Sequence, residues 1–183
     1  MKPRPDMRVT LFLAVLSVML TACEEKVKPT VLPEIDSKTL PHQESWTSTI
    51  TISDSGIVKA IISAGYIRVY EEPRRTLLSE GVVVDFYDEE GVKTSVLTSL
   101  EASVNDVTND LEAWRNVVVV SQSDSTVLRT ERLFWDNRRE LIHTPEFVRI
   151  VSPHEKIQGT GFEAEQNLKN YRIFKVSGES QAQ

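Results

Sequence analysis

Apolar and polar residues alternate along the chain from residue 46 onward, and no long helical period interrupts them. In "WTSTITIS" (46–53), Trp46, Ile50 and Ile52 fall on one side of an expected strand and three threonines on the other. "GVVVDFYDEEGVKTSVLTS" (81–99) shows the same alternation on both sides of a polar turn at residues 88–91, which is typical of a β-hairpin. Short strands separated by turn residues predict an all-β domain over residues 46–178.

The expected strands recur at an interval of about 30 residues. "LEAWRNVVVV" (111–120) aligns with "LIHTPEFVRI" (141–150), and "SVLTSLEASVND" (95–106) aligns with "TVLRTERLFWDN" (126–137). A weaker third copy covers 156–167 and 171–176. Each unit holds two strands, which cannot bury their inner face alone, so neighbouring units are expected to stack into one antiparallel sheet.

Four consecutive valines at 117–120 place apolar side chains on both faces of one expected strand. Residues 133–135 do the same. A sheet with one solvated face should alternate more regularly. The pattern leaves two interpretations open, a packed sandwich core and an apolar groove that holds a ligand.

The N-terminus has the pattern of a signal peptide. Three basic residues precede "VTLFLAVLSVML" (9–20), an apolar stretch of 12 residues that is too short to span a bilayer as a helix. "LTAC" (20–23) then resembles a bacterial lipobox, in which Cys23 carries the lipid. These residues predict a signal peptide over 1–22 and a lipid anchor at Cys23. The alternative is an ordinary signal peptide followed by a chance cysteine.

Residues 23–45 are expected to form the lipid anchor and an extended tether, because prolines recur there, glycine is absent and no period persists. A short strand around Val31 is the alternative. At the other end, residues 179–183 form a polar tail. The net charge of the chain is −6, and residues 1–22 contribute +2, which leaves −8 for the remainder. An acidic body repels nucleic acid and anionic surfaces at long range.

The sequence contains no pattern that supports catalysis, a cofactor or a metal. No nucleophile-elbow, zinc-protease or phosphate-binding-loop motif occurs, and the three histidines are not at metal-ligand spacing. The single cysteine excludes an internal disulfide and a cysteine-ligated metal site. Arg129, Arg132, Arg138 and Arg139 are either solvated residues around a turn or a phosphate-contacting patch. We therefore expect a protein that is not an enzyme.

The stretch from "GVVVDFYDEEG" (81–91) through "LEAWRNVVVV" to "LRTERLFWDN" (128–137) resembles the LptC family, and the ending "QGTGFEAEQNLKNYRIFKVSG" (158–178) fits it as well. This family is the periplasmic component of the lipopolysaccharide export ABC transporter and belongs to the wider OstA-like group. The resemblance covers about residues 46–178. Family members commonly keep an uncleaved transmembrane helix, whereas this chain has a lipobox.

The resemblance implies a twisted, boat-like stack of antiparallel strands, an OstA-like β-jellyroll with an apolar trough. It implies that lipopolysaccharide passes from the inner-membrane ABC transporter through this trough to a periplasmic bridge protein of similar fold. The protein would then be a lipid-anchored relay on the periplasmic face of the inner membrane, with the outer membrane as the less favoured place. The alternative is an envelope lipoprotein that serves as a scaffold and binds no lipid.

Two sets of residues follow as candidates. The apolar positions expected to face the trough and bind lipopolysaccharide are Leu78, Val82, Val84, Phe86, Val118, Val120, Leu133 and Trp135. The last strand of the repeat series is expected to pair with a partner through Tyr171, Arg172, Ile173, Phe174, Lys175 and Val176. The alternative for this strand is an unused edge that Arg172 and Lys175 protect.

Overall fold

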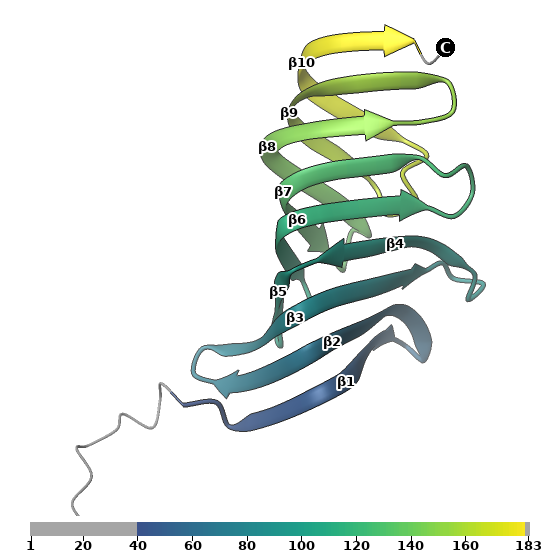
Figure 1. Cartoon of the computed structure of the whole chain (residues 1–183). Helices are drawn as coiled ribbons and strands as arrows, with labels where there is room; N and C mark the ends of the chain where they lie inside the picture. The colour runs from purple at the N-terminus through teal and green to yellow at the C-terminus, as the bar shows by residue number, and fades with distance from the viewer. Residues whose placement is uncertain (1–39, 182–183) are drawn as a thin grey trace, which may run out of the picture. The chain divides into compact units, whose positions relative to one another are not determined.

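Ten β-strands in one antiparallel sheet make up residues 40–181, which are the residues that the computed structural model describes (Figure 1). The strands are β1 (Gln43–Asp54), β2 (Ile57–Glu71), β3 (Arg74–Tyr87), β4 (Lys93–Ser99), β5 (Glu101–Asn105), β6 (Leu111–Ser121), β7 (Val127–Asp136), β8 (Leu141–Val151), β9 (Glu155–Glu165) and β10 (Tyr171–Gln181). The all-β prediction is confirmed. The predictions for the signal peptide, Cys23 and most of the tether lie outside the described residues.

The strands follow one another across the sheet almost in chain order. The order is β1-β2-β3-β4-β6-β7-β8-β9-β10, and β5 lies between β3 and β6. Because β4 and β5 pair with the same two neighbours, they are two halves of one strand that breaks at Leu100. β1 and β10 are the edge strands.

Each long strand bends near its middle, where the pairing register shifts or the backbone takes a positive φ. β3 bends at Glu80 and Gly81, with φ of 62° and 84°, and β6 bends at Arg115 and Asn116, with φ of 66° and 56°. The register also shifts in β8 between Thr144 and Phe147, about 30 residues after the bend in β6. The bend is therefore part of the repeated unit.

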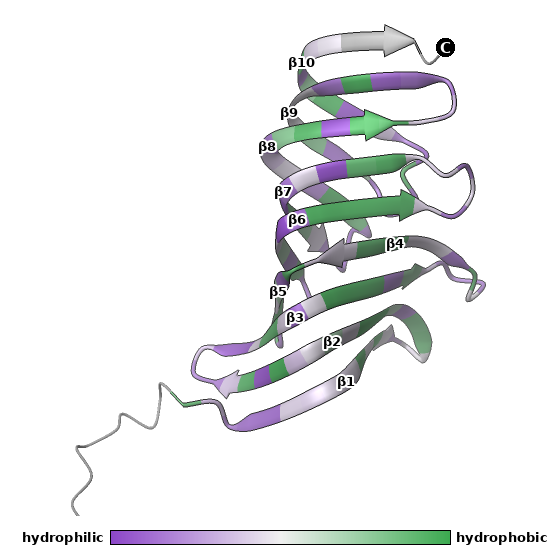
Figure 2. Cartoon of the chain, in the orientation of Figure 1, coloured by the Kyte–Doolittle hydropathy of each residue, from purple (hydrophilic) through white to green (hydrophobic). Residues whose placement is uncertain are grey.

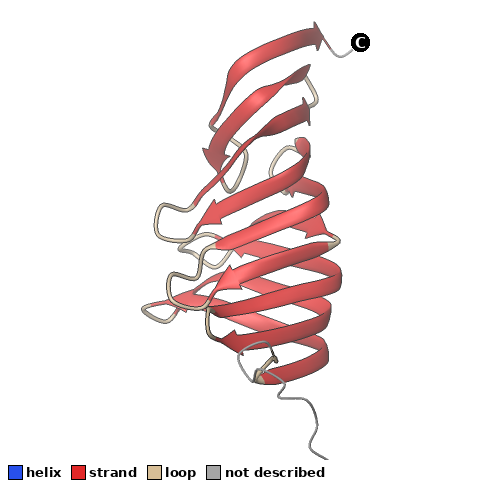
Figure 3. Cartoon of the chain, turned by 90° about the vertical axis from the view of Figure 1, so that its left-hand side faces the viewer, coloured by secondary structure: helices blue, strands red, loops and turns tan. Residues whose placement is uncertain are grey.

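The bends divide the sheet into two halves that face each other (Figures 1 and 3). Half A contains the segments 48–54, 57–64, 82–87, 93–99, 117–121, 127–130, 147–151, 155–160 and 175–181. Half B contains the segments 66–71, 74–79, 101–105, 111–114, 132–136, 141–144, 161–165 and 171–174. The buried apolar residues form one cluster between the halves. Figure 2 shows that apolar segments occupy the strands, whereas several connecting turns are hydrophilic.

Two expectations from the sequence need correction, one on the orientation of Trp46 in β1 and one on the two ends of the sheet. Trp46 does not share a face with Ile50 and Ile52, because Thr47 takes a φ of 49° and turns Trp46 outward, where it is 62% exposed. The sheet also extends beyond the expected range of 46–178. Residues 43–45 pair with β2 and residues 179–181 pair with β9. Backbone pairing holds these polar segments, so the hydrophobic pattern did not include them.

Candidate functional site

A row of apolar side chains crosses half A from one end of the sheet nearly to the other. Cross-strand pairing aligns Ile50, Ile62, Val84, Leu97, Val119, Leu128, Ile150 and Ile157, one from each of eight strands. The members from Ile62 to Ile150 are at most 1% exposed. Because all of them project from the inner face, they form a continuous apolar wall that runs across the strands.

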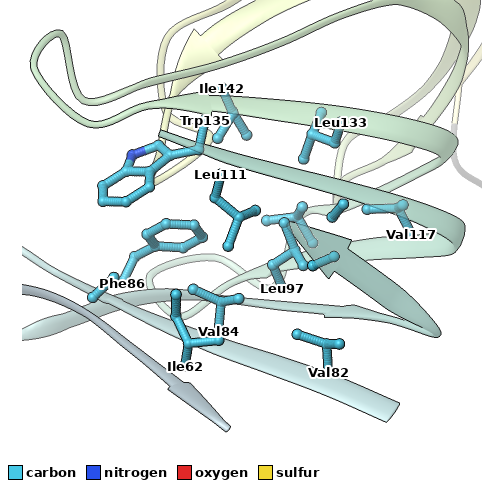
Figure 4. Packing of buried hydrophobic residues seen from close by; sticks show 14 of the residues in the cluster. Ile62, Val82, Val84, Phe86, Leu97, Leu111, Val117, Leu133, Trp135 and Ile142 are labelled. Carbon is cyan, nitrogen blue, oxygen red and sulfur yellow. The ribbon is translucent and has the colours of Figure 1, made fainter. Parts of the chain in front are cut away.

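A second row lines half B and faces the first. It consists of Val69, Thr76, Val104, Leu111, Trp135, Ile142, Ala164 and Tyr171. The two halves meet where the ring of Phe86 lies edge-on to Trp135, with the ring centroids 5.1 Å apart (Figure 4). The interior is therefore an apolar lane between two walls, and it follows the stacking direction of the strands.

The lane is packed in its middle and hollow near β10. In the middle its own side chains fill it, as in an ordinary sandwich core. Towards β10 the inward residues Ile157, Tyr171 and Ile173 are only half buried, because β10 is the edge strand of the described sheet. An open depression of about 550 Å³ lies at this end, where Ile157, Ala164 and Tyr171 line it together with charged residues such as Glu155, Glu163 and Arg172. The packed middle fits the sandwich-core interpretation, whereas an apolar groove that holds a ligand stays a prediction.

Six of the eight predicted trough residues project into the lane. Leu78, Val82, Val84, Phe86, Leu133 and Trp135 are each at most 1% exposed. Their contact with lipid stays a prediction.

The orientation expected for Val118 and Val120 is wrong. Val117 and Val119 face the interior instead, with 1% and 0% exposure. All four valines look alike in a hydrophobic pattern, and the bend before them decides which pair turns inward.

The outward valines belong to an apolar strip on the outer face of half A. Val118 lies beside Arg129, and Val120 lies between Val96 and Val127. These valines are partly buried. The run at 117–120 therefore supplies two surfaces, the inner wall and this outer strip.

Several of the polar residues considered for chemistry make structural contacts. His143 stacks on Phe134 with centroids 5.3 Å apart, and the backbone N–H of His154 donates to Ser152 in a turn. Arg132 pairs with Glu112, and Arg139 pairs with Glu163. No group of three or more potential metal ligands occurs within residues 40–181. That same part of the chain has no helix long and apolar enough to cross a membrane.

The edge of β10 presents backbone groups that no strand of the described chain uses. The Glu165 N–H donates to the Asn170 carbonyl at 3.2 Å, which makes these two residues a hydrogen-bonded pair at the start of the β9–β10 hairpin. Hydrogen-bonded and non-hydrogen-bonded pairs alternate along antiparallel strands. It follows that the N–H of Arg172 faces β9, whereas those of Ile173 and Lys175 face away. A β-bulge between Val176 and Gly178 ends this regular stretch.

Comparison with protein families decides the family of the chain. A family model described as "Lipopolysaccharide-assembly, LptC-related" matches residues 9–178. The chain belongs to the LptC-related family. A search of curated protein sequences returned no match. Membership gives an LptC-related protein a role in lipopolysaccharide assembly and transport, as a non-enzymatic transport component of the cell envelope that works with lipopolysaccharide and with other components of the transporter.

Proposed function

We propose that this LptC-related protein is a periplasmic relay that holds the acyl chains of lipopolysaccharide in the apolar lane. It receives the lipid from the inner-membrane ABC transporter and passes it to a periplasmic bridge protein of similar fold. The observation that carries this proposal is the pair of facing apolar rows, which cross nearly the whole sheet and end in a half-buried, hollow region next to β10. A lane open at one end suits a ligand that moves through.

The energetics favour the interior as the lipid site. Each buried methylene of an acyl chain contributes about 0.8 kcal/mol, so several methylenes packed against the apolar walls give useful binding affinity. The remainder of the chain after residue 22 carries a charge of −8, which disfavours a phosphate-bearing headgroup near the bulk of the surface. The acyl chains therefore lie inside, and the charged sugars and phosphates stay outside.

The proposal includes docking of the bridge protein at β10. A strand of similar fold that pairs with residues 171–176 would extend the sheet and, with it, the lane. The outward N–H groups of Ile173 and Lys175 supply the hydrogen-bond donors, and the open depression beside β10 is the place where the two interiors would join.

Photo-crosslinking tests the lipid site. A photo-reactive residue at position 84, on the inner wall, is expected to capture lipopolysaccharide, whereas one at position 83 or 85, on the outer face, is not. Capture is measured by the mobility shift of the crosslinked protein and by detection of the lipid. Equal capture on the two faces, or none at position 84, would favour the scaffold without lipid, which the packed middle of the lane suits equally well.

The relay also needs to be held at the membrane, and we infer that Cys23 provides the anchor. Several acyl chains on one cysteine give firm anchoring. Cys23→Ala is expected to abolish incorporation of labelled fatty acid and to shift the protein from the membrane to the soluble fraction. Efficient labelling of the Cys23→Ala protein would contradict the lipobox.

A further inference from the structure

On the side of the lane opposite the bends, the two halves are joined by non-covalent contacts alone, and some of these are made by turn residues. The hairpin turns lie on this side, since each long strand runs from one turn through its bend to the next turn. Along the bends, in contrast, the chain itself joins half A to half B. The two sides of the lane are therefore held by different means: covalent backbone on one, non-covalent contacts on the other.

A small group of polar contacts closes the turn side. The Lys59 ammonium of half A donates to Glu140 Oε1, in the β7–β8 turn, at 2.6 Å. Gln166, in the β9–β10 turn, donates from its side-chain Nε2 to the Tyr87 backbone carbonyl at 2.9 Å. The backbone carbonyl of Gln166 accepts a hydrogen bond from Ser95 Oγ at 2.5 Å. We call these five residues the latch. Its partners are more than 70 residues apart in sequence, so each contact joins the two halves.

Leu168, in the same turn as Gln166, supports the closure. It is 2% exposed and takes a φ of 61°, which directs its side chain into the core between the halves. The β9–β10 turn thus covers the lane with one apolar residue and one polar residue.

The closed arrangement is incompletely satisfied. Gln166 Oε1 and Trp135 Nε1 are buried without a hydrogen-bond partner in the described structure. A buried polar atom without a partner costs about 1–3 kcal/mol. The Lys59–Glu140 pair is itself a moderate contact, because the Glu140 side chain is 37% exposed and the Lys59 side chain loses most of its hydration. Closure is therefore held by the apolar cluster between the halves together with these few polar contacts, and two buried polar atoms have no hydrogen-bond partner in the described structure.

The charge on Lys59 is secure at neutral pH. The hydrogen bond with Glu140 raises the pKa of Lys59 above its usual 10.5. The ion pair is consequently present throughout the physiological range, and its opening requires mechanical separation of the turns rather than a change in pH.

We propose that the latch closes a lateral opening through which acyl chains reach the lane. The inference rests on the proposed function, since it describes how the ligand of that site is admitted. When the latch contacts break, the ends of the two halves part beside the latch, and the inner apolar side chains next to it become accessible. An acyl chain then enters sideways while its headgroup remains outside, so the bulky sugars never cross the interior.

A reversible lock tests the opening. The variant Lys59→Cys/Glu140→Cys, in the full chain with a photo-crosslinker at position 84, is joined by a short bifunctional methanethiosulfonate reagent. Capture of purified lipopolysaccharide is expected to fall about tenfold and to return when reductant releases the lock. The two single-cysteine variants, treated in the same way, control for modification of Cys23 and of each new thiol.

A matched pair of substitutions weakens the latch without a crosslinker. Lys59→Met removes the contact across the opening and is expected to raise the rate of capture about threefold or more. Lys93→Met is the control, because Lys93 pairs with Asp85 at 2.8 Å within half A. Capture that is the same in the locked and released protein, or the same in both lysine variants, overturns the latch. Absence of capture in the unlocked protein overturns the lipid site itself, and the latch with it.

Discussion

Val84→Asp is expected to unfold the domain or to lower its free energy of unfolding by about 4 kcal/mol or more. Val84 is 0% exposed and stands between Ile62 and Leu97 in the apolar row of half A. The substitution removes a buried apolar side chain, worth about 1.5–3 kcal/mol, and adds a carboxylate without a partner, whose desolvation costs several kcal/mol more. Denaturant unfolding followed by circular dichroism measures the change.

Val83→Asp is the matched control for this prediction. Val83 is the adjacent residue of β3, 41% exposed on the outer face, so the same substitution there should change the free energy of unfolding by about 0.5 kcal/mol or less. Similar losses at positions 83 and 84 would show that the inner and outer faces of β3 have been assigned incorrectly, and would remove the basis for the lipid lane.

Lys175→Pro is expected to weaken binding of the bridge protein by about tenfold or more while the domain stays folded. Proline removes the outward N–H of Lys175 and places its ring where the incoming strand would pair. The Lys175 side chain is exposed, so the substitution takes little from the core. A tenfold loss of binding affinity corresponds to about 1.4 kcal/mol. This is the range expected for the loss of one backbone hydrogen bond between the paired strands. Titration of the purified bridge protein measures the dissociation constant.

Lys175→Ala separates the backbone from the side chain. If strand pairing gives most of the affinity, Lys175→Ala should bind nearly as well as the original chain. Phe174→Pro is a poorer probe, because by the alternation of pairs the Phe174 N–H faces β9 and its loss disturbs the hairpin itself. If Lys175→Pro folds and binds at full strength, the bridge protein docks elsewhere.

Local pattern was enough to predict the class and the order of the strands. Alternating residues on either side of the polar turn at 88–91 predicted a hairpin, and the structure places a turn there, with a positive φ at Gly91. The 30-residue repeat predicted that neighbouring units stack, and the strand order follows the chain. The first signal is local, because a strand's alternation and a turn's residue preference act within a few positions, and the second is a repeat that the sequence itself displays.

Local pattern was also enough for Val82, Val84 and Phe86. Their neighbours Asp85 and Tyr87 are polar or amphipathic, so only one face of β3 is consistently apolar, and the structure buries that face. The same method failed for Val118 and Val120, where both faces are apolar. Hydropathy then carries no information about direction, and the bend at Arg115 and Asn116 decides it.

The sequence by itself determined that this chain forms a stack of β-hairpins with a shared apolar face, and its motifs determined the family. Only the tertiary structure decided which valines face the lane, where the strands bend, and which turns meet across the opening. Lys59 and Glu140 show the reason: they are 81 residues apart, and neither has a neighbour that marks it as half of a pair. Contacts of this kind depend on how the whole sheet twists and bends, which no local period records.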